Sequence, residues 1–221
     1  MKSSKNWLYL LLGASFFVQA TTSFIGGFIG IGPFTLNGNM ATDMHNIAGN
    51  IKGVYTGMFL QIVTALVIIV LAAALYQAGS HINKTAAIVA AGFYLVEAVI
   101  HIVGQFVIFA IAETSVQFVS GGDYSLITAA SLLFATRSFI GAIAMMPFGL
   151  GAIIFYYLIT KAKVIPNWIG LWGLITAPVV LIVWTLKAFN VVSAPLELNA
   201  AYVPWEWVTG IYIFIKGFKT K

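Results

Sequence analysis

The apolar runs of this chain constrain its fold more than any other feature, because each is long enough to cross a lipid bilayer. A helix rises about 1.5 Å per residue, so roughly 20 apolar residues cross the hydrocarbon core of about 30 Å. The first run extends from Trp7 to Ile31, 25 residues without a charge. The runs lack the alternating pattern of membrane β-barrel strands. The sequence therefore predicts an all-α protein, an integral membrane bundle of helices.

The composition agrees with this fold class. Of the 221 residues, 61% are hydrophobic and 8% are charged, whereas about a quarter of the residues in a typical soluble domain are charged. The net charge of +5 comes from single lysines near the ends of apolar runs, without the basic stripe that binds nucleic acid. The chain has no cysteine, which excludes disulfides and thiolate metal sites. We expect one transmembrane domain over residues 1–221 that has the lipid bilayer as its partner and does not bind nucleic acid. The sequence does not indicate an oligomeric state.

Six apolar runs are predicted to span the membrane. They cover residues 7–31, 54–76, 85–112, 138–160, 168–186 and 205–218. The fourth belongs to a longer helical pattern, from Tyr124 to Thr160, which as one straight helix would extend about 55 Å and exceed the bilayer. We therefore expect a kink near Pro147 and a separate short helix over residues 124–136. This short helix would lie along the outer interface or pack over the bundle.

Two polar stretches are predicted to be loops. The longer one, from Gly32 to Gly53, contains Pro33 and four asparagines, residue types that favour turns. The other extends from Asn190 to Pro204, contains Glu197 and precedes the last predicted span.

The lysines predict how the helices are oriented. With six spans and a cytoplasmic amino terminus, eight lysines lie on the cytoplasmic side, and only Lys52 and Lys187 lie outside. Such an excess of positive charge is typical of cytoplasmic loops. We expect a multi-pass protein of the cell inner membrane with both termini in the cytoplasm. The first run also resembles a signal peptide cleaved after Ala20, although it continues eleven residues further, and Gly26 and Gly30 form a pattern typical of close helix packing.

Polar side chains in the third predicted span form the centre of a candidate site. Glu97, His101 and Gln105 recur every four residues. They share one helix face with Tyr94, because a helix turns about 100° per residue. A carboxylate deep in a bilayer costs several kcal/mol unless it is paired or protonated. An intramembrane Glu one turn from a His is therefore a candidate functional centre.

Two further charged residues are expected near the outer ends of their spans, Arg137 before the fourth and Glu206 at the start of the sixth. A water-filled cleft that opens outward would satisfy these two residues together with Glu97 and His101, with Arg137 bridging one or both carboxylates. We therefore predict a pocket that binds or moves a small solute or a proton. Its predicted binding residues are Glu97, His101, Gln105, Arg137, Glu206 and Tyr94.

Other interpretations of the same residues stay open. Glu97 and Arg137 would suit a structural ion pair in a structural or assembly subunit without a site. Alternatively, Glu97 and His101 serve a membrane enzyme as acid and base or as metal ligands, but zinc would then have to recruit His45 and Asp43 from the outer loop. A haem held by two histidines is not expected, because no span contains a second histidine beside His101. No phosphate-binding glycine loop or nucleophile motif is present. We predict no cofactor, and we favour a protein without enzyme activity over an enzyme.

Three stretches of the chain resemble a known family. They are LYQAGSHINKTAAIVAAGFYLVEA from Leu75 to Ala98, YYLITKAKVIPNWIGLWGLI from Tyr156 to Ile175, and PWEWVTGIYIFIKGFKTK from Pro204 onward. The chain is similar there to the bacterial integral membrane family called domain of unknown function 4386, and the resemblance covers nearly the whole sequence. It implies a six-helix inner-membrane protein with no assigned biochemical activity. The family pattern also implies that a histidine often stands near the position of Arg137. This chain departs from the pattern there, because it has an arginine.

Overall fold

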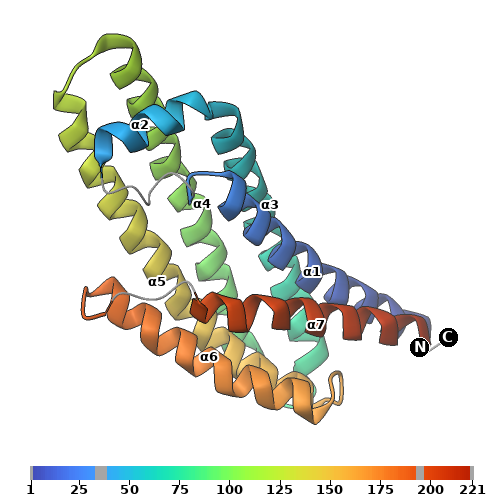
Figure 1. Cartoon of the computed structure of the whole chain (residues 1–221). Helices are drawn as coiled ribbons and strands as arrows, with labels where there is room; N and C mark the ends of the chain where they lie inside the picture. Colours follow the sequence, from blue (N-terminus) through green and yellow to red (C-terminus); the bar gives the residue numbers. More distant parts are fainter. Residues whose placement is uncertain (1, 33–38, 193–196, 220–221) are drawn as a thin grey trace.

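The computed structural model describes residues 2–32, 39–192 and 197–219. Within these ranges the chain forms seven α-helices that pack into one bundle (Figure 1). They are α1 (Lys2–Ile29), α2 (Met40–Gly49), α3 (Ile51–Gly79), α4 (Lys84–Gly121), α5 (Ser125–Lys161), α6 (Asn167–Ala188) and α7 (Glu197–Lys219). The predicted all-α helical bundle is confirmed.

Five of the helices in the described ranges are long and apolar enough to cross a membrane: α1 from Asn6 onward, α3, α4, α5 and α6. Large apolar side chains cover their outer surfaces, and Phe28, Phe106 and Leu132 are 71%, 70% and 70% exposed. Apolar surface on this scale marks contact with lipid rather than water. The chain is therefore a multi-pass membrane protein. The sixth span, predicted over residues 205–218, lies in α7 and stays a prediction.

The long helices from α1 to α6 pack side by side in sequence order, and α7 returns to pack along α1 (Figure 1). α1 packs on α3, α3 on α4, α4 on α5, and α5 on α6. The core between them includes many small residues such as Ala72, Ala90 and Ala152, which are fully or almost fully buried. Small residues allow helix backbones in a membrane to approach closely.

Glycines set the closest approach of α1 to α3 and to α7. A Cβ atom on Gly57 of α3 would lie 2.6 Å from the Cα of Gly30 and 2.8 Å from the carbonyl oxygen of Gly26. A Cβ atom on Gly13 would lie 2.7 Å from the carbonyl oxygen of Gly210 in α7. Because the opposing atoms are backbone, a larger residue would push the helices apart. The close helix packing predicted at Gly26 and Gly30 is confirmed.

The stretch predicted to be the longest loop, from Gly32 to Gly53, instead contains α2. The side chain of Asn39 accepts a hydrogen bond from the backbone N–H of Thr42 at 3.2 Å and so caps the start of α2. Asp43 lies in the first turn, where its charge suits the positive end of the helix. The loop prediction is wrong here because residue types that favour turns also cap helices.

The separate outer helix predicted over residues 124–136 is absent. α5 continues without a break through this stretch, with Pro147 inside it. α4 also extends past the predicted end at residue 112 and stops at Gly122, whose φ of 66° is left-handed. At their lengths α4 and α5 extend about 57 Å and 55 Å, beyond the thickness of a bilayer.

The extra turns of α4 and α5 are covered by α2. Met44 of α2, Phe118 of α4 and Ala130 of α5 form a small buried cluster. Among the helices that the structure describes, the short one is therefore α2 rather than the predicted outer helix. α7 likewise begins at Glu197, inside the stretch from Asn190 to Pro204 that was predicted to be a loop.

Candidate functional site

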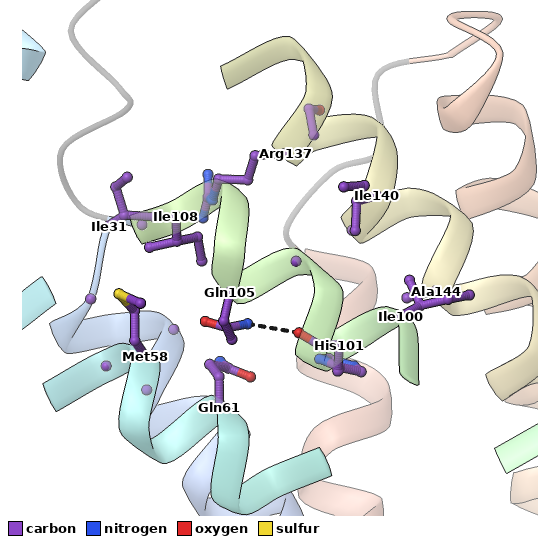
Figure 2. A pocket seen from close by; sticks show the side chains of 18 of the residues that line it. Ile31, Met58, Gln61, Ile100, His101, Gln105, Ile108, Arg137, Ile140 and Ala144 are labelled. Carbon is purple, nitrogen blue, oxygen red and sulfur yellow. Dashed lines mark hydrogen bonds between the residues drawn. The ribbon is translucent and has the colours of Figure 1, made fainter. Parts of the chain in front are cut away.

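The bundle leaves a cavity of about 510 Å³ between α1, α3, α4, α5 and α6 (Figure 2). A Cβ atom on Gly141, which lines it, would meet no atom within 4 Å, so this position borders open space. The volume lies in the range of about 300–1,000 Å³ that is typical of small-molecule sites. Much of the wall consists of residues without side chains, namely Gly26, Gly27, Gly30, Gly32, Gly57, Gly104 and Gly141.

Three of the six predicted site residues line this cavity. His101 and Gln105 reach it from α4, and Arg137 reaches it from α5. Figure 2 shows Gln105 between Arg137 on one side and Gln61 of α3 on the other. Part of the polar face of α4 therefore meets Arg137 across this cavity.

Four polar lining residues were not among the predicted site residues: Gln61, Ser138, Trp184 and Lys187. Gln61 is the only strongly polar side chain in the run of residues 54–76, a signal that could have identified it. Lys187 directly follows the predicted end of the fifth span. Its position at the cavity depends on how α6 packs against α5, which no local sequence pattern indicates.

Two buried polar groups of the cavity wall are unsatisfied within the described part of the chain. Gln105 is 7% exposed, and its Nε2 donates a hydrogen bond to the backbone oxygen of His101 at 3.0 Å. Its Oε1 is buried without a hydrogen-bond partner, as is the indole Nε1 of Trp184. Burying a polar group without a partner costs roughly 1–3 kcal/mol, so both groups favour a ligand or water in the cavity.

Two cations belong to the cavity wall. Arg137 interacts electrostatically with Lys187, and the Nζ of Lys187 lies 4.2 Å from the centre of the Trp184 ring. Among the side chains that the structure describes, the contact between His101 and Glu97 is the one between an acidic and a basic side chain inside 4.0 Å. The predicted bridge from Arg137 to a carboxylate is therefore wrong.

The other three predicted site residues, Tyr94, Glu97 and Glu206, lie in a separate buried cluster. They are 2%, 4% and 6% exposed and do not line the cavity. Glu97 of α4 and Glu206 of α7 are close enough for their charges to interact, and Tyr156 and Tyr202 interact with Glu206 in the same cluster. The single cleft predicted for all four ionisable residues is therefore wrong. The structure divides them between a cavity and a cluster of carboxyls and tyrosines.

His101 connects the two regions. It lines the cavity, and its Nε2 lies 3.8 Å from Oε1 of Glu97. This distance is too long for a hydrogen bond but short enough for an ion pair if the imidazole is protonated. The other oxygen of Glu97, Oε2, is buried without a hydrogen-bond partner in the described residues. The contact therefore joins a titratable group in the cavity wall to a carboxyl behind it.

The residues that a metal site would have to recruit lie elsewhere. Asp43 and His45 belong to α2, where the ring of His45 packs 5.5 Å from that of Phe118. Among the residues that the structure describes, no three His, Asp or Glu side chains are grouped as metal ligands. The recruitment of Asp43 and His45 to Glu97 and His101 is therefore not supported.

Comparison with known proteins places nearly the whole chain in one sequence family. The sequence model of a family described as "Domain of unknown function (DUF4386)" matches residues 11–217. No curated protein and no solved structure matches the chain. The matched range includes every residue of the cavity wall and of the buried carboxyl cluster.

Proposed function

This chain belongs to the family described as Domain of unknown function (DUF4386), and we propose that it binds or moves a small solute in the cavity, with His101 and Glu97 as a proton-titratable centre. The observation that carries the proposal is the cavity of about 510 Å³, toward which His101, Gln105 and Arg137 turn.

Energetics in the membrane support this assignment. Lipid offers no partners to polar side chains, so within a bundle they turn toward one another or toward a water-filled space. A purely structural group would satisfy its members with hydrogen bonds among themselves. In the described chain, Gln105 bonds only to the backbone of His101, and its Oε1 is left over.

The contact between His101 and Glu97 supports a role for a proton. A neutral imidazole has one nitrogen that donates and one that accepts, so it can pass a proton between two neighbours. His101 has the cavity on one side and Glu97 on the other. A proton exchanged between a solute and Glu97 would therefore pass through His101 once a side-chain movement shortens the 3.8 Å contact to a hydrogen bond.

The lysine distribution supports an outward-facing cavity in the inner membrane, with both termini in the cytoplasm. In that orientation the cavity lies in the outer half of the bundle. Its wall contains the end of α1 at Gly30, the start of α3 at Val54 and the end of α6 at Lys187.

Thiol labelling tests whether water fills the cavity, because the chain has no cysteine of its own. Ala144 is 2% exposed and lines the cavity from α5. We expect Ala144→Cys in intact cells to react with a small, charged, membrane-impermeant methanethiosulfonate added from outside, since only a hydrated thiol ionises and reacts.

Two variants provide the matched controls. Gly92→Cys places a thiol on α4 where a Cβ meets no atom within 4 Å and which does not line this cavity, so lipid should leave it unreactive. Lys52→Cys, at the exposed start of α3, should react fully from outside. Equal and low labelling of Ala144→Cys and Gly92→Cys, with Lys52→Cys labelled, would refute a water-filled outward cavity.

A further inference from the structure

We propose that the solute of this cavity is an anionic amphiphile, a molecule with one carboxylate or phosphate head on an apolar body. This inference rests on the proposed function and specifies the chemical class that the site would take. Its basis is a pair of cations at one end of the cavity, an unsatisfied donor beside them and an apolar wall elsewhere.

The charge of the wall is the first argument. None of the lining residues in the described part of the chain is acidic, whereas Arg137 and Lys187 both belong to the wall and lie close enough to repel each other. Among the side chains that the structure describes, neither cation has a carboxylate within 4.0 Å. Two neighbouring cations at membrane depth are costly, and an anion between them would reduce that cost.

The available hydrogen bonds are the second argument. The guanidinium of Arg137 offers several donors in a fork that matches a carboxylate or phosphate. The buried Nε1 of Trp184, next to Lys187, has no acceptor in the described chain. The amide nitrogens of Gln61 and Gln105 already donate to backbone oxygens, at 3.0 Å in each case. The buried donor that has no partner among the described residues therefore lies beside the two cations, where an oxygen-rich head would accept from it.

The remaining wall is the third argument. It consists largely of aliphatic and aromatic side chains that a small inorganic anion would leave in contact with water, namely Ile31, Met58, Ile100, Ile108, Phe134 and Ile140. Figure 2 shows Ile31 and Ile108 near Arg137 and shows Ile100 near His101. Burial of hydrocarbon against these residues would stabilise the complex by about 25 cal/mol for each Å² of apolar surface removed from water.

Equilibrium binding of radiolabelled palmitate to the full chain, purified in a neutral detergent, tests the inference. We expect saturable binding that dodecyl phosphate displaces and that the neutral monopalmitoylglycerol and inorganic phosphate do not displace. The double variant Arg137→Gln/Lys187→Gln should raise the Kd for palmitate about tenfold or more, because it removes charge-assisted hydrogen bonds to the head. Arg137→Lys/Lys187→Arg should retain most of the affinity.

Lys84→Gln/Lys161→Gln is the matched control. It removes two exposed lysines, one at the start of α4 and one at the end of α5, that do not line the cavity. It should bind palmitate as the wild type does. The inference is overturned if the wild type does not bind palmitate, if monopalmitoylglycerol competes equally, or if Arg137→Gln/Lys187→Gln binds unchanged. If inorganic phosphate competes at concentrations as low as those of palmitate, the claim that the ligand has an apolar body is wrong.

The two proposals fail in distinguishable ways. If Ala144→Cys is labelled from outside but palmitate does not bind, the cavity stands and the anionic class is wrong. If palmitate binding survives the cavity-filling variant Gly141→Leu, the anion binds elsewhere and the assignment to this cavity is wrong.

Discussion

Glu97 is the residue whose surroundings distinguish a functional site from a structural ion pair. It is 4% exposed, lies 3.8 Å from His101, and has a second oxygen without a partner in the described chain. A structural ion pair would bring hydrogen-bonded contacts to both oxygens, because an ion pair repays its desolvation only with such geometry. The geometry around Glu97 therefore fits a proton site better than a structural brace.

Replacing Glu97 by its neutral isostere separates these two roles. We expect Glu97→Gln to insert and fold, with a Tm in detergent within about 3 °C of the wild type, because no strong pair is lost. We also expect it to lose the activity, so that it fails to restore the phenotype of a strain lacking the gene. Breaking a structural ion pair would cost about 3–5 kcal/mol and lower the Tm by roughly 6–20 °C. A fall of that size, with activity retained in the surviving protein, would assign Glu97 to structure.

At the scale of single helices, α7 decides the topology. It packs along α1, where Gly210 faces Gly13, and the indole Nε1 of Trp207 donates a hydrogen bond to Oγ1 of Thr21 at 3.1 Å. The start of α1 and the end of α7 lie near each other at the same end of the bundle (Figure 1). Because α1 is one of the membrane-crossing helices, this pairing agrees with the prediction of a sixth span in α7, which stays a prediction.

Fusions to each terminus test α7 as a sixth span. With both termini in the cytoplasm, green fluorescent protein should fluoresce at either end, and alkaline phosphatase at the carboxyl end should be inactive. A fusion after Lys52 should show the opposite pattern and serves as the control. Active phosphatase at the carboxyl end, with a fluorescent amino-terminal fusion, would leave five spans and contradict the predicted orientation.

Helix existence was more predictable than helix boundaries. The apolar runs predicted the membrane-crossing helices because their length reflects the bilayer. The first turns of α5 were misassigned because they are stabilised by the end of α4 and by α2, through Met44, Phe118 and Ala130. Such contacts between distant segments leave no local periodicity. The glycine pattern at Gly26 and Gly30 predicted close packing but did not identify Gly57 as its partner.

At the scale of the whole molecule, one helix face serves two regions. The spacing of Glu97, His101 and Gln105 placed them on one face of α4, and the structure agrees that His101 contacts Glu97. However, the surroundings of this face change along its length. Gln105 lines the cavity between α3 and α5, whereas Glu97 lies close enough to Glu206 of α7 for their charges to interact. Sequence spacing within α4 cannot reveal this division, because it depends on where the bundle places Glu206.

The central claim is that the polar groups of this membrane protein surround a hydrated cavity, and filling that cavity tests the claim most directly. The measurement is the rate at which an impermeant thiol reagent, added from outside, labels Ala144→Cys. Adding Gly141→Leu, whose side chain would occupy open space in the cavity, should slow labelling about tenfold or more, whereas adding Gly92→Leu, which lines no cavity, should leave the rate unchanged. An equal rate in both double variants would contradict the account, because the reagent would then reach residue 144 by another route.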